Sequence, residues 1–278
     1  MLVGLPRKKL FWAVGSAHLV NDIFMSFGAV LLAFLSISVL PMTNTQIGIA
    51  ISLRQLLSAI SQPGFGIRAD RYGGRGVGAG GLLWVVFTFM LSIIAAIATG
   101  SYILMLIPFV LQGLGSGAVH PVGSLHATES DKDRAGSSIA YFFLMGQLGL
   151  AIGPTLIGLL LDAANPDPMA IFTAASGLPP MASFRADFTP IFFAVTFAIL
   201  PVWLMLTTIP LRKPVIKEKD TSEKTASTGI SREVMIPFLI LGVMVILRSL
   251  ANPGAVSFIP VLFQQKGWSP SEYGFITS

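Results

Sequence analysis

The sequence predicts an all-α, polytopic membrane protein, and three observations carry that prediction. Hydrophobic residues make up 53% of its 278 positions, charged residues only 11%, and the mean hydropathy is +0.76. A soluble domain carries about 25% charged residues. Several apolar stretches are long enough to cross a bilayer, and basic residues gather in alternate loops between them. Because backbone groups in lipid must bond within their own segment, each stretch is expected to form a helix.

The membrane segments follow one another along the whole chain. A helix that crosses ~30 Å of hydrocarbon at 1.5 Å per residue needs about 20 residues. An eighth segment begins near Ser271, after seven that meet this length: residues 10–38, 46–66, 77–99, 102–124, 136–161, 188–210 and 236–262. The first follows Arg7, Lys8 and Lys9 but is longer than the core of a signal peptide, so we expect an uncleaved helix.

The basic residues predict the orientation. Only Arg185 and Lys266 fall in loops on one side, whereas fourteen of the 18 Lys and Arg residues fall on the other: residues 7, 8, 9, 68, 71, 75, 132, 134, 212, 213, 217, 219, 224 and 232. By the positive-inside rule the N-terminus and the loops 68–75, 129–135 and 211–235 are cytoplasmic, and the protein lies in the cell (inner) membrane. This distribution explains the net charge of +5 without a nucleic-acid partner.

Several classes of chemistry find no support in the sequence. The absence of cysteine excludes disulfides, thiolate catalysis and cysteine-ligated metals. A membrane-embedded enzyme would have to use His18, His120 or His126 with Asp22, but no nucleophile–base or metal-ligand spacing is present. The sequence contains no glycine-rich nucleotide-binding loop, so we do not expect transport driven by ATP. We therefore expect no enzyme, no cofactor and no metal.

Three charged residues fall inside membrane segments: Asp22, Arg54 and Arg248. Each costs about 2.5–3.5 kcal/mol on insertion scales, so each requires an explanation. Helix rise places all three ~18 Å from the cytoplasmic side, near the midplane, and places Gln112 and Gln147 at similar depth. These residues predict a polar cavity that binds substrate or couples protons. The alternative is an Asp22–Arg54 ion pair that only stabilises the bundle.

His18, Asn21 and Asp22 lie at i, i+3 and i+4, so they share one face of the first helix. An aspartate with a nearby histidine could relay protons. The alternative is a hydrogen-bonded polar seam between helices.

Arg248 has no acid in its own segment, and Asn252 shares its face, followed by Pro253-Gly254. That dipeptide could break the helix and expose backbone carbonyls, as in discontinuous transporter helices. A surplus of arginine near the midplane would suit an anionic substrate, because guanidinium groups bind carboxylate and phosphate bidentately.

A charged, glycine-rich decapeptide joins the second and third segments: Gly66-Ile67-Arg68-Ala69-Asp70-Arg71-Tyr72-Gly73-Gly74-Arg75. It resembles the loop between helices 2 and 3 of the major facilitator superfamily of transporters, although that family usually has an apolar residue where this chain has Arg68. The resemblance implies two parallel six-helix halves. It also implies a conformational latch, in which Asp70 engages a neighbouring helix end in the outward-facing state. The other residues of this predicted latch are Gly66, Arg71, Gly73 and Arg75. The alternative is a solvated loop that only sets topology.

Three further stretches carry a closer resemblance: His18-Leu19-Val20-Asn21-Asp22, Ser61-Gln62-Pro63-Gly64-Phe65-Gly66, and the glycine-rich run 113–123 with His120-Pro121. They resemble the fosmidomycin-resistance branch of that superfamily. This implies a proton antiporter for efflux of a small compound, conferring drug resistance. An anion is one option for that compound, since fosmidomycin is a phosphonate.

The same resemblance suggests gating residues. His120 and Pro121 are gating candidates, the alternative being a structural His-Pro helix terminus near the cytoplasmic mouth. Gly153-Pro154-x-x-x-Gly158 partly resembles the antiporter motif of drug exporters, the alternative being small-residue packing between helices.

An internal repeat suggests the domain organisation. Residues 45–52 align with residues 271–278 at an offset of 226, since both place glycine fourth and both end in serine. We expect a six-helix N-terminal bundle at 1–210, a cytoplasmic linker at 211–235, and the start of a second bundle at 236–278. On this basis the chain is expected to be a truncated piece of a longer transporter. A native seven-helix protein is the alternative.

The expected function is secondary active transport, with export against protons by alternating access. The alternative is proton- or ion-coupled uptake of a small organic or inorganic anion, bound by Arg54 and Arg248. A seven-helix receptor is disfavoured by the repeat, the linker and the decapeptide. The expected partners are a small-molecule substrate, protons and the lipid bilayer, with the protein a monomer.

Overall fold

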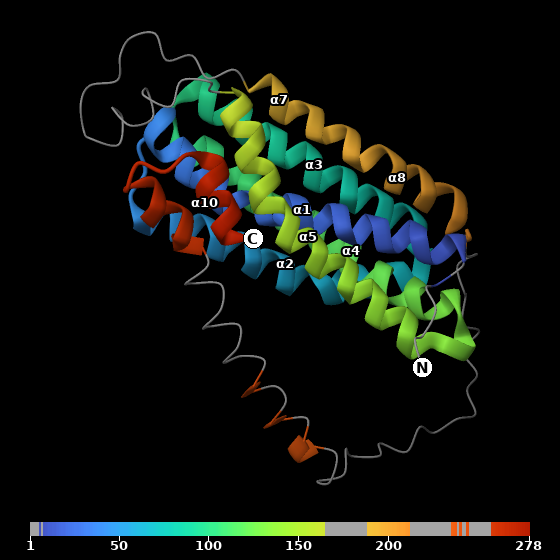
Figure 1. The fold of residues 1–278 in the computed structure, drawn as a ribbon. Helices are drawn as coiled ribbons and strands as arrows, with labels where there is room; N and C mark the ends of the chain where they lie inside the picture. The colour runs from blue at the N-terminus through green and yellow to red at the C-terminus, as the bar shows by residue number, and fades with distance from the viewer. Residues whose placement is uncertain are drawn as a thin grey trace.

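A computed structural model describes residues 8–164, 188–211 and 257–278, together with Pro6 and seven positions between 235 and 244. All regular structure within these ranges is helical. The long helices run side by side along a common direction (Figure 1). The prediction of an all-α bundle is confirmed.

The helices follow the predicted segments but extend beyond them. The first five are α1 (Lys9–Ser38), α2 (Asn44–Tyr72), α3 (Gly74–Thr99), α4 (Tyr102–Ser130) and α5 (Ala135–Ala164), with a 3-10 turn η1 (Lys132–Arg134) before α5. The next segment is continuous through α7 (Thr189–Phe192), η2 (Phe193–Val195) and α8 (Thr196–Thr208). After it come a helix at residues 257–264 and α10 (Pro270–Thr277).

The decapeptide forms a tighter connection than the expected loop at 68–75. Helix α2 continues to Tyr72 and α3 starts at Gly74, so Gly73 alone joins them. Its φ of 91° lies in a region that favours glycine because a Cβ there meets the backbone. Asp70 and Arg71 lie exposed on the last turn of α2. Most of the predicted loop at 68–75 is therefore helical, because the helix continues beyond the apolar segment.

Helix α1 lies at the centre of the bundle and packs against α5, α4 and α8. Its side chains are buried on all sides, as expected of a helix that is apolar all round. Phe24 and Phe27 of α1 pack with Phe89 of α3 at ring-centroid distances of 5.4 and 5.5 Å. Any polar residue on α1 therefore has to be satisfied inside the bundle.

Five of the described helices or helical runs are long and apolar enough to cross a membrane: α1, α3, α4, η1–α5 and α7–α8. Large apolar side chains such as Leu83, Phe87 and Ile94 of α3 are exposed on the bundle surface. Helix α2 has 29 residues but is more polar, and its polar side chains line an internal cavity described below. The arrangement is that of a multi-pass membrane protein.

The C-terminal segment contacts the bundle at the end where α2 begins, which we call the Thr43 end. The side-chain amide of Gln264 donates to the carbonyl of Ala33 on α1. The carboxylate of Asp162 on α5 accepts the backbone N–H of Ser271 at 3.1 Å. Figure 1 shows α10 beside this end of α5.

The two segments of the repeat begin in the same way. Thr43 and Gln46 form a capping box at the start of α2, and Ser269 and Glu272 form one at the start of α10. Both residues of the second box lie at an offset of 226 from the first, so the same cap occurs at equivalent positions of the repeat. The expected linker at 211–235 lies almost wholly outside the described residues.

Candidate functional site

A cavity of about 620 Å³ lies between α1, α2, α4 and α5, with Ser257 and the end of α10 on its wall. This volume is within the range of small-molecule sites, roughly 300–1,000 Å³. Its polar lining includes Asp22, Arg54, Gln55, Ser58, Gln62, Ser116, His120 and Gln147. The positions from α2 are spaced as one face of a helix, which explains why this helix is polar although it belongs to the bundle.

Two of the polar residues form a buried pair on α1. Nε2 of His18 lies 3.3 Å from Oδ2 of Asp22, and the side chains are 6% and 10% exposed. The second oxygen of Asp22 accepts a hydrogen bond of 2.7 Å from the amide of Asn21, which also donates to Ser116 of α4 at 3.2 Å. The predicted grouping of His18, Asn21 and Asp22 on one face is thus realised as a connected polar cluster.

The hydrogen bond of the other ring nitrogen of His18 indicates where the imidazole carries a hydrogen. Nδ1 lies 2.8 Å from the backbone carbonyl oxygen of Phe142 on α5. A carbonyl oxygen only accepts, so Nδ1 carries a hydrogen. Nε2 is then the ring nitrogen that faces the carboxylate of Asp22. His18 and Asp22 thus form a buried pair of an imidazole and a carboxyl group at hydrogen-bonding distance.

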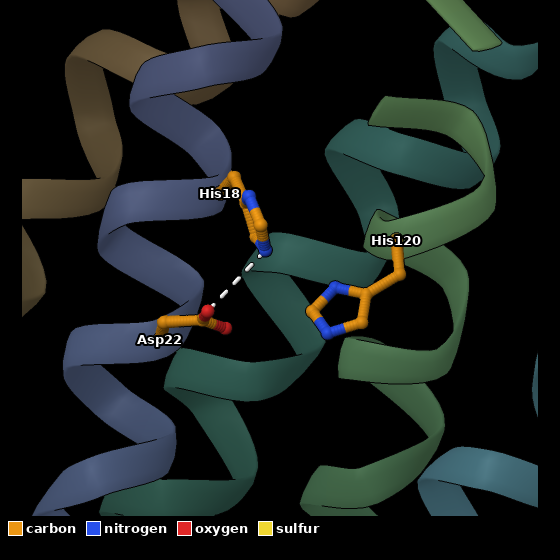
Figure 2. A group of neighbouring side chains, drawn as sticks. All are labelled: His18, Asp22 and His120. Atoms are coloured by element: carbon orange, nitrogen blue, oxygen red, sulfur yellow. Dashed lines mark ion pairs between the residues drawn. The ribbon is translucent and has the colours of Figure 1, made fainter. Parts of the chain in front are cut away.

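His120 of α4 completes the group that faces the cavity. Its ring centroid lies 5.0 Å from that of His18, edge to face. Figure 2 shows His18 and Asp22 of α1 pointing toward His120 across the space between the helices. The nitrogens and the carboxylate oxygen of the three lie within 4.8 Å of one another, a spacing at which they could exchange a proton or share a metal ion. Nδ1 of His120 has no hydrogen-bond partner among the described residues.

This location corrects one alternative for His120. Helix α4 continues through Pro121 to Ser130, so the histidine does not end a helix. The idea of a structural His-Pro helix terminus is wrong, because α4 extends well beyond the apolar stretch from which its end was inferred. Pro121 lies inside α4, where its Cβ would be 3.7 Å from a Cβ added at Gly66 of α2.

Close contact between α1 and α5 holds the pair in place. A Cβ added at Gly146 would lie 2.7 Å from both Oδ2 of Asp22 and Nε2 of His18. Gly153 faces Ser26 and the carbonyl of Ile23 in the same way. The ring of Phe142 stacks on His18 at 4.1 Å. Small-residue packing, one of the two interpretations of the Gly153-Pro154 motif, is therefore present.

Arg54 occupies a separate position on the cavity wall. It is only 4% exposed, and its Nη atoms donate to Oε1 of Gln112 at 2.9 Å and to the carbonyl of Met25 at 2.7 Å. Its guanidinium lies 4.6 Å from the ring centroid of Phe109. Among the described residues it forms no ion pair with Asp22, whose partners are His18 and Asn21. The alternative of an Asp22–Arg54 ion pair is wrong.

The other predicted site residues divide into three groups. Gln112 is fully buried behind Arg54, and Gln147 of α5 lines the cavity. Arg248 and Asn252 lie outside the described residues. Gly66, Asp70, Arg71, Gly73 and Arg75, the predicted latch, gather at the junction of α2 and α3, away from the cavity.

Sequence reasoning missed several partners in the site. The carbonyls of Phe142 and Met25 have no signature in a sequence, because every residue carries that group. Ser116 lies inside a glycine-rich run where its hydroxyl gave no separate signal. Gly146 could have been suspected from its place in the glycine-rich fifth segment, but not its contact with His18.

Comparison with known proteins identifies the family. A family model described as "Major Facilitator Superfamily" matches residues 13–278 of the chain. The chain belongs to the Major Facilitator Superfamily.

Two curated relatives are similar to a little over half of this chain. A protein of Cupriavidus pinatubonensis, called a probable 4-methylmuconolactone transporter, is 33% identical over 172 residues, which are 60% of this chain and 38% of the relative. The fosmidomycin resistance protein of Escherichia coli is 29% identical over 169 residues, which are 59% of this chain and 39% of the relative. The matched region thus spans well under half the length of each relative. Membership of the superfamily indicates a transporter rather than an enzyme.

Proposed function

We propose that this chain is part of a proton-coupled secondary transporter that exports a small compound by alternating access. The observation that supports it most is the buried His18–Asp22 pair, whose facing Nε2 and Oδ2 atoms could share one proton beside a cavity large enough for a small molecule. A proton antiporter needs a buried group that is loaded from one side and unloaded by substrate or by a change of access. Intramembrane acids and histidines serve that purpose in pumps and transporters.

The charged and titratable neighbours of the pair make it responsive to the contents of the cavity. His120 of α4 and Arg54 of α2 line the cavity beside the pair. From α5, the imidazole of His18 contacts the carbonyl and ring of Phe142 and the ring of Phe143. His120 could exchange a proton with the pair through a bridging water, since the nitrogens and the carboxylate oxygen lie within 4.8 Å of one another. A bound solute near these groups would change how tightly the pair holds its proton.

Alternating access would use both ends of the bundle. We place the Thr43 end outside and the Gly73 junction in the cytoplasm, in accord with the charge distribution of the loops. The contacts of Asp162 with α10 and of Gln264 with α1 would then close the outer side. Asp70, exposed at the end of α2, would form its latch contact only when the cytoplasmic side closes. This scheme treats residues 1–210 and 236–278 as parts of two bundles in the inner membrane, acting as a monomer.

Transport in vesicles tests this proposal. The full-length protein is reconstituted with a pH dye inside, and fosmidomycin or another candidate drug is added to one side. Proton movement opposite to the drug, lost in Asp22→Asn and retained in the exposed-acid control Asp133→Asn, is the expected result. Proton movement in the same direction as the compound would instead support uptake of an anion, the second candidate, which the uncompensated charge of Arg54 favours.

A further inference from the structure

Arg54 is a buried cation that has no anionic partner among the described residues. Its side chain is almost fully buried, and no carboxylate lies within ion-pair distance in the described part of the chain. The segment 236–256, most of which lies outside the described residues, contains no Asp or Glu in its sequence. Buried charges are ordinarily paired, because an isolated ion loses the solvation that water gives it. Arg54 departs from that rule.

The surroundings of Arg54 hold the guanidinium in place without neutralising it. The amide oxygen of Gln112 and the carbonyl of Met25 are neutral acceptors, and the ring of Phe109 offers a cation–π contact at 4.6 Å. A guanidinium has five N–H donors. Nε is buried and has no hydrogen-bond partner in the described residues, and each Nη forms one hydrogen bond there although it carries two hydrogens.

The protein also makes room for this charge. Atoms of the guanidinium lie 2.6–2.9 Å from the position that a Cβ would take at Gly28 of α1, so only glycine allows this approach. Met25 and Gly28 lie three and six residues after Asp22, which puts the guanidinium ~4–9 Å along α1 from the carboxylate by helix rise. An anion and the coupling proton would thus bind at neighbouring positions of one cavity.

We infer that Arg54 binds an oxoanion group of the transported compound, a carboxylate, phosphate or phosphonate. The anion supplies the missing counter-charge and accepts the unused N–H donors, for which the planar guanidinium is suited. That the bound anion is also transported rests on the proposed function, whereas its binding to Arg54 does not. The substrate class that follows is small organic acids rather than neutral or cationic drugs.

Equilibrium binding to the purified full-length protein, at fixed pH and with no gradient, tests the inference. The probes are matched pairs of an acid and a neutral analogue: fosmidomycin and its diethyl ester, phenylphosphonate and its diethyl ester, and benzoate and benzamide. At least one acid should bind more tightly than its neutral partner. Arg54→Gln should lower the affinity for the acid by about 10- to 100-fold, with little effect on the neutral partner, since a hydrogen bond to a charged group is lost.

Two further variants separate recognition from structure. Arg54→Lys keeps the charge and should restore part of the preference for the acid. Arg68→Gln removes an exposed arginine outside the cavity and should change nothing. Equal loss of acid and neutral binding in Arg54→Gln, or no acid preference in the wild-type protein, would overturn the inference. If Arg54-dependent binding is found but Asp22→Asn leaves proton movement intact, the coupling proposal fails and the anion site stands.

Discussion

At the scale of single residues, the site depends on how little space α5 leaves beside α1. His18 and Asp22 approach each other because Gly146 has no side chain to separate them. The hydrogen on Nδ1 of His18 is fixed by a carbonyl of the same helix, α5. One helix therefore sets both the distance and the tautomer of the pair on another.

Gly146→Ala should disrupt the pair. The added methyl group would lie 2.7 Å from Nε2 of His18 and from Oδ2 of Asp22, so the side chains or the helices must move. Overpacking of this kind costs about 1–3 kcal/mol. We expect a lower melting temperature in detergent and loss of proton-coupled transport.

Gly136→Ala is the matched control, because nothing lies within 4 Å of a Cβ added there on the same helix. Alanine should be tolerated and should favour the helix by about 0.5–1 kcal/mol. An unchanged transport rate in both variants would contradict the close packing between α1 and α5.

Part of this site could be predicted from the sequence. The spacing of His18, Asn21 and Asp22 was enough to place them on one face, since helix periodicity fixes it. The partner of Asp22 could not be predicted from the sequence. Arg54 and Asp22 have similar predicted depths, but depth does not indicate the direction in which each side chain points. The carbonyls that satisfy His18 and Arg54 leave no trace in the sequence.

At the scale of helices, the junction between α2 and α3 is the most constrained connection. A single residue reverses the chain between two long helices, and its φ is 91°. Gly73→Ala should therefore strain the junction by roughly 1–2 kcal/mol. We expect slower transport with little change in substrate affinity, measured as initial rates and equilibrium binding in the same preparation.

Gly76→Ala serves as its control, since a Cβ there meets nothing within 4 Å and the residue is not at positive φ. Equal rates for the wild-type protein and Gly73→Ala would show that the junction is not stressed during the cycle.

The bounds of the helices were the less predictable part of the fold. The membrane length set the expected ends of α2 and α4 at residues 66 and 124, whereas the helices end at Tyr72 and Ser130. Hydropathy reports where lipid ends, and a helix can continue into water as long as its backbone bonds are made. Conversely, the start of α2 shows a capping box at Thr43 that the sequence pattern T-x-x-Q permits.

At the scale of the whole molecule, the described C-terminal residues pack on the bundle and form part of the cavity wall. Gly274 of α10 lies so close to Pro154 of α5 that a Cβ there would meet its carbonyl, and the hydroxyls of Thr155 and Ser278 are 2.6 Å apart. The order of the described helices could be predicted because apolar length and loop charge are local properties. The packing of α10 on α5 could not, because it depends on side chains more than 100 residues apart.

A disulfide across this contact should stop the cycle. The native sequence has no cysteine, so Thr155→Cys combined with Ser278→Cys introduces the only pair. Oxidation should form the cross-link and abolish transport, and reduction should restore it, if the two helices must separate in each turnover. The single-cysteine variants are the controls, and full activity of the cross-linked protein would show that this contact is static.

The central claim is that His18 and Asp22 share one proton, with His120 and Arg54 as the nearest charged or titratable groups on the cavity wall. Infrared difference spectroscopy against pH, with isotope-labelled histidine, observes the carboxyl and imidazole groups directly. We predict that an Asp22 carboxyl signal and a His18 imidazole signal change together in one step, and that Asp22→Asn removes both. Two independent steps, or an Asp22 carboxylate signal that does not change with pH, would contradict a proton shared by His18 and Asp22.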